Sequence, residues 1–429
     1  MKLLSILGLL FSINSFAMFK NHHPNRLVVK SSSDQFLKHE LIKGSKHIFG
    51  NYYVIFSDDI HSLKRDLEQN KNISNVDFDY KADKSKLPSL EKVNLIKSND
   101  TSVFNDPLLG NQWALRDASQ NGMHIISTFG NRRSAPEKEI IVAVVDTGVD
   151  FNHPDLPMWT NENEIPGNGI DDDNNGYIDD IHGINTLVRD SEGKATMNIM
   201  DTHSHGTHVS GSIAAIQNNA LGVAGIASKA KIMALRTVPN SSDETDVDVT
   251  EAFIYAAENG AKVINCSFGK SVNERGMMVR DAINHIGRAH GVLVVAAAGN
   301  SRRNIDTYPT YPASFDSENL LVVASSTSNG GLSWFSNYGL ESVDIVGPGS
   351  SIFSTVPGAR YSSMSGTSMA SPNVAGVAAE VLANHPNLSP VELKQILMNS
   401  STKLPTYESR VGSGGRAHLE AALNLAREY

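Results

Sequence analysis

Residues 366–372 place a serine where it could act as a nucleophile. The segment reads Gly-Thr-Ser-Met-Ala-Ser-Pro, and an apolar run of helical length follows it. The N-terminus of a helix leaves backbone N–H groups unpaired and carries partial positive charge, so it can stabilise a nearby oxyanion. Ser and Thr are also common at helix starts for structural reasons alone. The segment by itself therefore leaves Ser368 either as a nucleophile or as part of a capped helix start.

Three other segments carry side chains that suit nucleophilic catalysis. A strand-like apolar run ends at Asp146, a helix of small residues begins at His205, and a second apolar run leads to Asn300. Open α/β sheets bind their ligands at the carboxyl ends of strands, which is where the first and third of these residues stand. The chain thus contains a carboxylate, an imidazole, an amide and a hydroxyl in positions from which they could act together.

These motifs resemble those of the subtilisin-like serine proteases, the subtilases of peptidase family S8, whose triad runs Asp, His, Ser along the chain. The resemblance extends over roughly residues 105–425 and implies hydrolysis of peptide bonds through an acyl-enzyme. It makes Ser368 the nucleophile and His205 its general base and acid, because an imidazole titrates near neutral pH. Asp146 would orient the imidazole, and Asn300 would donate its amide to the oxyanion together with the backbone N–H of Ser368.

The three histidines at 203, 205 and 208 raise the alternative of a metal centre. Imidazole is the commonest metal ligand in proteins. Zinc is disfavoured because no His-Glu-x-x-His helix is present. We expect His208 to be a packed helix residue with a hydrogen bond, and we expect no catalytic metal.

Residues 168–180 form an acidic repeat that suits calcium. They read Asn-Gly-Ile-Asp-Asp-Asp-Asn-Asn-Gly-Tyr-Ile-Asp-Asp, with carboxylate or amide oxygens at every second position before a glycine turn. Calcium takes six to eight oxygen ligands, and the pattern resembles the first half of an EF-hand loop, although His182 replaces its closing Glu. An acidic solvated loop remains the alternative. The expected ligands are Asp171, Asp173, Asn175, the Tyr177 carbonyl and Asp180.

The family resemblance implies a second calcium site. In subtilases the Asp of a His-Pro-Asp segment joins a loop that follows the catalytic-His helix. The matching residues are Asp155 and Asn219 with the carbonyls of Gln217, Leu221 and Val223, and Gln112 is a weaker candidate. Both ions would be structural, so the folded state would gain stability as calcium concentration rises.

The N-terminal part of the chain suggests a secreted precursor. Residues 1–17 have one Lys, a short apolar run and small residues at the end, which is typical of a signal peptide rather than a spanning helix. Residues 18–104 are Lys-rich, with strand-like runs at 26–30, 52–56 and 73–80, and resemble the small α+β propeptide that folds and inhibits a subtilase. The propeptide would be removed by self-cleavage near 97–104. An unrelated binding domain is the alternative.

The remaining residues, 105–429, predict one catalytic domain. Strand-like segments at 231–238, 263–267 and 320–324 alternate with helical segments at 249–259 and 277–290. Such alternation predicts an α/β fold, and the resemblance specifies the subtilisin-like three-layer form, a mostly parallel central sheet with helices on both faces. The single cysteine, Cys266, excludes a disulfide network and lies in a strand-like run, so we expect it to be buried.

Substrate preference and partners follow mainly from the resemblance. The formal net charge of -9 and the lack of a basic amphipathic helix argue against nucleic-acid and membrane partners. We expect a monomer, secreted to the medium or the periplasm, that binds protein or peptide substrates and its own propeptide. The acidic loop 241–248 either favours basic residues upstream of the cut or is merely solvated. The primary pocket would be formed by Ser267, Phe268, Gly269, Ala297, Ala298 and Gly299, with Thr310 at its floor.

Overall fold

The computed structural model describes most of the chain after its first 21 residues. The described residues are 22–82, 87–97, 103–132, 135–136, 138–190, 194–240, 244–271 and 277–429. The expected signal peptide at 1–17 lies outside them. Within these ranges, no helix has both the length and the apolar character that crossing a bilayer requires.

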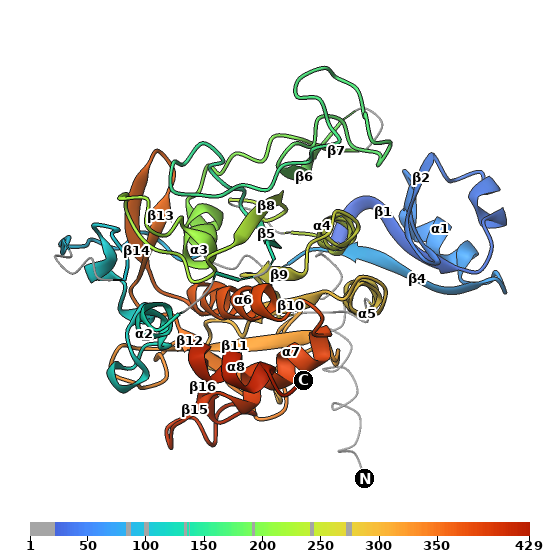
Figure 1. Ribbon diagram of the computed structural model, residues 1–429. Helices are drawn as coiled ribbons and strands as arrows, with labels where there is room; N and C mark the ends of the chain where they lie inside the picture. The colour runs from blue at the N-terminus through green and yellow to red at the C-terminus, as the bar shows by residue number, and fades with distance from the viewer. Residues whose placement is uncertain are drawn as a thin grey trace, which may run out of the picture.

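A small antiparallel sheet forms the N-terminal unit (Figure 1). Its strand order is β2-β3-β1-β4, and helix α1 packs against it over a core that includes Leu27, Ile55 and Leu63. Alternating apolar residues along β1 and β4 bury one face of the sheet, as a period of two requires. The elements are β1 (His22–Ser31), η2 (Gln35–Lys38), β2 (Gly44–Phe49), β3 (Tyr52–Phe56), α1 (Ile60–Leu67) and β4 (Ile73–Tyr80).

A ten-stranded sheet organises the rest of the chain. Its order is β15-β16-β12-β11-β10-β9-β5-β8-β6-β7, and the strands are parallel except where β7 and β15 pair at the two edges. The strands are β5 (Ile140–Asp146), β6 (Gly183–Arg189), β7 (Ala195–Thr196), β8 (Ala230–Arg236), β9 (Val263–Cys266), β10 (Leu293–Ala297), β11 (Leu320–Ser326), β12 (Ile345–Pro348), β15 (Thr402–Lys403) and β16 (Gly415–Arg416). A separate hairpin joins β13 (Ile352–Val356) and β14 (Arg360–Met364).

Helices cover both faces of this sheet, and strand β5 shows why. Val142 and Val144 belong to the core that contains α3 and α6, whereas Ala143 and Val145 belong to the core under α4 and α5. A strand buried on both faces reads as a continuous apolar run, which is what parallel sheets require. The helices are α2 (Ile125–Gly130), α3 (His205–Ala214), α4 (Asp246–Glu258), α5 (Met278–His290), α6 (Thr367–Asn384), α7 (Pro390–Asn399) and α8 (Leu419–Ala426), with short 3-10 turns η3 (Leu109–Asn111), η4 (Trp113–Leu115) and η5 (Ala118–Gln120).

The expected fold class is confirmed, with three layers around a mostly parallel sheet. The small N-terminal sheet packs beside α4 and α5 (Figure 1). Ion pairs cross this interface between basic residues of the small sheet and acidic residues of the helices, including Lys30 with Asp281 and Lys46 with Glu251. Cys266 is fully buried, and burial raises the pKa of its thiol well above the usual value. Its burial agrees with the expectation from its strand.

Candidate active site

The carboxyl end of β5 lies against the first residue of α3. There, Asp146 Oδ1 lies 2.7 Å from His205 Nδ1, and both side chains are buried. Gly206 makes this approach possible, because a Cβ atom at that position would lie 2.1 Å from the carbonyl oxygen of Gly148. The pair fixes which imidazole nitrogen faces the carboxylate and leaves His205 Nε2 available for a different partner.

Asp201 organises the start of α3 and ties it to β5. Its carboxylate accepts hydrogen bonds from the backbone N–H groups of His203, Ser204 and Thr207. It also accepts from the hydroxyl of Thr147 at 3.0 Å, next to Asp146. Unpaired N–H groups at a helix start favour a carboxylate in this position. The sequence-based prediction did not include Asp201, although an Asp just before a helix of small residues is a signal for such a cap.

Ser368 lies in the first turn of α6. Its hydroxyl donates to the backbone carbonyl of Ser267 at 2.9 Å, while Ser267 donates to the carbonyl of Ser368 at 2.8 Å. The Nε2 atom of His205 has no hydrogen-bond partner among the described residues. Ser368 must therefore leave the Ser267 carbonyl before it can donate to His205.

Two hydrogen-bond donors converge beside this serine. A Cβ atom placed on Gly366 would lie 3.5 Å from Asn300 Nδ2 and 3.6 Å from the backbone nitrogen of Ser368. Because residue 366 is a glycine, it places no side chain of its own between these donors, and Pro88 Cγ lies 3.0 Å from the same point. The other end of the Asn300 amide is fixed, because its Oδ1 accepts from the backbone N–H of Thr367 at 2.8 Å and from the Thr367 hydroxyl at 2.9 Å. Such an arrangement can stabilise an oxyanion.

A pocket opens next to Ser368. Thr310 lines it near two glycines, since Cβ atoms on Gly269 and Gly299 would lie 3.3 Å and 3.5 Å from Thr310 Cγ2. Ala298 does not line the pocket, because its carbonyl accepts from Asn337 and its N–H donates to the neighbouring strand. Of the expected pocket residues, the structure brings together Ser267, Phe268, Gly269, Ala297, Gly299 and Thr310.

The comparisons with known proteins agree with this geometry. A model of the Subtilase family matches residues 137–414. Thermitase of Thermoactinomyces vulgaris is 41% identical over 55% of this chain and 72% of its own length. The chain belongs to the subtilase family.

Other relatives extend the match. Subtilisin-like protease 1 of Plasmodium berghei is 32% identical over 78% of this chain and 57% of its own length. The chain therefore spans little more than half of that relative. A solved protease structure from Pseudoalteromonas arctica superposes with a TM-score of 0.61 at 28% identity, covering 76% of this chain and 99% of the other.

The two histidines on either side of His205, His203 and His208, have different surroundings. His208 is fully buried and its Nε2 lies 2.9 Å from the carbonyl of Ile352. Burial lowers the pKa of His208 to about 3, so the ring is neutral. His203 is half-buried, with its ring centroid 6.4 Å from that of His205. Among the described residues, the one cluster close enough to share a metal contains no histidine.

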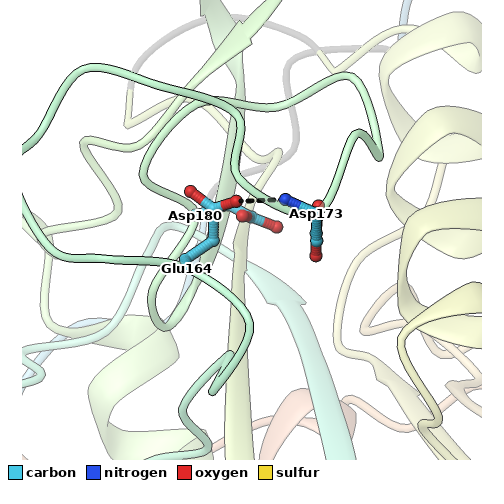
Figure 2. Close-up of side chains that lie close together, drawn as sticks. All are labelled: Glu164, Asp173 and Asp180. Carbon is cyan, nitrogen blue, oxygen red and sulfur yellow. Dashed lines mark hydrogen bonds between the residues drawn. The ribbon is translucent and has the colours of Figure 1, made fainter.

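The acidic loop brings three carboxylates together (Figure 2). Ligand oxygens of Glu164, Asp173 and Asp180 lie within 4.8 Å of one another. Burial raises the pKa of Asp180, and the nearby Asp173 raises it further. Asn175 bridges two of them, since its Nδ2 lies 3.2 Å from Asp173 Oδ2 and 3.0 Å from Asp180 Oδ2. The three carboxylates suit calcium, which prefers oxygen ligands, but the amide of Asn175 turns its nitrogen toward them and its oxygen toward the backbone N–H of Tyr177.

The loop differs in part from the expected ligand set. Glu164 was not predicted, because it lies ahead of the acidic repeat and carries no sign of its role except charge. Asp171 accepts from the backbone N–H groups of Asn175 and Gly176, so it shapes the turn. The hydroxyl of Tyr177 donates to Glu251, and its N–H donates to Asn175.

The second expected calcium site also includes a residue that the sequence did not predict. Asp155 is fully buried, accepts from Asn219 Nδ2 at 2.7 Å and from Val223 N at 3.1 Å, and burial raises its pKa to about 6. Asp106 adds to this shift, is itself buried, and its Oδ1 has no partner among the described residues. An unpaired buried carboxylate oxygen beside a second carboxylate calls for a cation.

The other candidates near this second site are already bonded. Gln112 exchanges two hydrogen bonds with the backbone of Ala224. The Nε2 atom of Gln217 donates to the carbonyl of Gly225. Leu221 donates its backbone N–H to Asn219. These bonds involve none of the three expected carbonyl ligands, those of Gln217, Leu221 and Val223.

The acidic residues near the expected upstream subsites are largely paired. Residues 241–243 lie outside the described ranges. Asp246 pairs with Lys270 at 2.5 Å, and Asp248 pairs with Arg189 at 2.5 Å and with Arg26 at 3.3 Å. The charges of Asp246 and Asp248 are therefore balanced within the chain.

The chain itself crosses the subtilase cleft. Lys81 pairs with Thr245 in an antiparallel bridge, and Glu91 pairs with Ser363 in another. Between these bridges, Leu87 and Pro88 line the pocket that holds Ser368. The chain thus meets Ser368 upstream of the stretch 97–104, where the cut was expected.

Proposed function

We propose that this chain is a secreted, calcium-dependent serine endopeptidase that is made as a self-processing zymogen. One observation carries the proposal. The backbone nitrogen of Ser368 and the amide nitrogen of Asn300 border the same point beside Gly366, where Pro88 of the chain itself lies, and the buried Asp146–His205 pair stands at the end of β5. Nucleophile, base, orienting carboxylate and oxyanion donors are the groups that acyl transfer needs.

The chemistry would run through an acyl-enzyme. His205 Nε2 would take the proton of Ser368 as its oxygen attacks the scissile carbonyl, and Asp146 would stabilise the imidazolium. The negative oxygen of the tetrahedral intermediate would accept from Asn300 and from the Ser368 N–H. His205 would then give the proton to the departing amine, and a water would repeat the sequence to release the acid.

Occupation of the cleft by the chain's own residues supports a zymogen. Lys81 and Glu91 form antiparallel bridges with Thr245 and Ser363, and Leu87 and Pro88 line the pocket of Ser368, as parts of a bound peptide would. Peptides that pair with exposed backbone in this way bind through main-chain hydrogen bonds. We propose that residues 18–104 are the prosegment, with the first cut where the chain meets Ser368, and that residues 105–429 are the catalytic domain.

The two carboxylate clusters support a structural role for calcium. Glu164, Asp173 and Asp180 would hold one ion, and Asp155 with Asp106 and the loop 217–223 would hold another. Bound calcium would neutralise these buried charges and would stabilise only the folded state. Secretion is proposed from the signal-like residues 1–17, and a monomer is proposed because the site draws all of its groups from one chain.

Expression of the full wild-type chain beside Ser368→Ala tests the proposal. We expect the wild type to release a shortened protein that degrades casein, while Ser368→Ala keeps its full prosegment and is inactive. A wild-type chain that stays uncut and leaves casein intact would instead favour a binding protein that retains the scaffold.

A further inference from the structure

Glu91 occupies a defined place beyond the nucleophile. The chain enters the cleft at Lys81, which pairs with Thr245, and passes Ser368 at Pro88. It then pairs with Ser363 of strand β14 through Glu91, whose N–H donates to the Ser363 carbonyl at 2.8 Å. Glu91 therefore lies on the leaving-group side of the cleft, three residues after Pro88, which lies next to Gly366.

The carboxylate of Glu91 is held by two serine hydroxyls. Ser365 donates to Oε1 at 2.5 Å, and Ser351 donates to Oε2 at 3.1 Å. Each oxygen of the carboxylate thus has its own donor. The two serines flank the two ends of the β13–β14 hairpin, so the hairpin fixes their spacing.

The Ser365 hydroxyl is oriented so that its proton faces the carboxylate. Its oxygen accepts a hydrogen bond from the backbone N–H of Ser351 at 2.7 Å. A hydroxyl has one proton to donate, and because Ser365 only accepts in this bond, its proton remains free to be donated to Glu91. Ser351 itself has a φ of 50°, a left-handed conformation that is uncommon for serine and that aims its N–H at Ser365.

A site built from oriented donors selects an acceptor. A carboxylate accepts at both oxygens, and hydrogen bonds to a charged acceptor are stronger than those to a neutral one. An amide would offer only one oxygen, and an ammonium group would offer none. We propose that Ser351 and Ser365 form a subsite on the leaving-group side of the cleft that selects substrates with a glutamate a few residues after the cut.

This inference rests on the proposed protease function, with residues 87–91 bound as the leaving-group side of a substrate would be. A separate bond offers an internal control. Ser362 donates to the backbone carbonyl of Glu91 at 3.2 Å. Because this bond goes to the main chain, Ser362 should hold any peptide in this register, whatever its side chain.

Peptide hydrolysis tests the subsite. The enzyme, obtained by expressing the full chain, is given a peptide series in which a single Glu moves through the five positions after the cut, beside a matching Gln series. We expect kcat/KM to show one maximum, at the third to fifth position, with Glu preferred over Gln by about five- to tenfold.

Two variants separate side-chain selection from general binding. The double variant Ser351→Ala/Ser365→Ala should bring the Glu-to-Gln ratio close to one, because it removes both donors to the carboxylate. Ser362→Ala should lower kcat/KM for both series by the same factor and keep the ratio. A flat profile, or a Glu preference that survives the double variant, overturns the inference. Failure to cut any peptide would instead count against the proposed protease function.

Discussion

The side-chain oxygen of Asn300 accepts two hydrogen bonds from Thr367, one from its backbone N–H at 2.8 Å and one from its hydroxyl at 2.9 Å. The Thr367 hydroxyl in turn accepts from the N–H of Gly299 at 3.0 Å. These bonds fix which end of the amide is the donor toward Ser368. Thr367 thus positions the amide that we propose as the oxyanion donor, without touching the reacting atoms.

Thr367→Val should impair the transition state more than substrate binding. Valine keeps the shape but loses the hydroxyl, so the Asn300 amide can rotate and the donor is lost for part of the time. We expect kcat to fall by about tenfold or more with little change in KM, since loss of the whole donor costs about 10² to 10³. Thr367→Ser keeps the hydroxyl and should stay near wild type. Equal kcat values for the Val and Ser variants would contradict the role.

Asp201→Asn should loosen the link between β5 and α3. The carboxylate of Asp201 now accepts from several donors, one of which is Thr207 Oγ1 at 2.6 Å from Oδ2. The amide of the variant would turn its own N–H groups toward some of these donors. We expect a loss of about 2 kcal/mol or more in the free energy of unfolding, because a buried set of bonds is left unsatisfied. Urea unfolding in a Ser368→Ala background measures it. Asp316→Asn, at an exposed carboxylate, is the control; similar losses for both variants would refute the assignment.

The alternation of strand-like and helical segments predicted the α/β class, and the resemblance to subtilases predicted the three layers and named the four groups of the candidate site. Apolar runs such as 140–146 mark buried parallel strands whatever their neighbours, because both of their faces are covered. Asp146, His205, Asn300 and Ser368 each stand at or beside an element end, and parallel strands bring such ends to one edge. The Asp146–His205 bond and the shared space between Asn300 and Ser368 follow from that placement.

Contacts between segments far apart in the chain were not predictable in the same way. Glu164 and Asp106 join their carboxylate clusters through loop folding, which leaves no periodic signal. Ser368 turns toward Ser267, a rotamer that residue types do not specify. The chain meets Ser368 at Leu87 and Pro88, upstream of the stretch 97–104, between the bridges that Lys81 and Glu91 form.

Calcium removal should lower the melting temperature, and Glu164 should matter to the size of the shift. In the Ser368→Ala chain, which cannot cut itself, we expect added calcium to raise Tm and EDTA to lower it, since saturation at 100 times Kd is worth about 2.7 kcal/mol. Glu164→Gln should shrink the calcium-dependent shift. Glu162→Gln, at an exposed position two residues away, should leave it intact. A Tm that ignores both calcium and EDTA would count against both sites.

Stability should depend on pH through Asp79, at the interface of the small sheet with α4. Burial raises the pKa of Asp79 to about 7. The nearby negative charge of Asp248 also raises this pKa, whereas Arg26, whose Nε lies 3.3 Å from Asp79 Oδ2, lowers it. The folded chain binds this proton more tightly than the unfolded chain does. The stabilisation is therefore complete below about pH 4 and is lost as pH rises to about 7.

The variant Asp79→Asn tests this dependence, because an amide has no proton to lose. With Ser368→Ala as the common background, we expect the Tm of the chain that keeps Asp79 to fall relative to the Tm of the variant between pH 4 and 7. Above that window the difference between the two Tm values should be constant. Parallel Tm curves for the two chains across the whole range would show that Asp79 does not titrate there.

Labelling with a fluorophosphonate tests the central claim most directly, because this reagent bonds to a serine that a neighbouring base activates. The expressed wild-type chain is treated and digested, and the modified residue is located by mass spectrometry, beside Ser368→Ala and His205→Ala. We predict a single adduct on Ser368 of the wild type and none in either variant. A wild-type chain without an adduct on Ser368, or equal labelling in His205→Ala, would contradict the account.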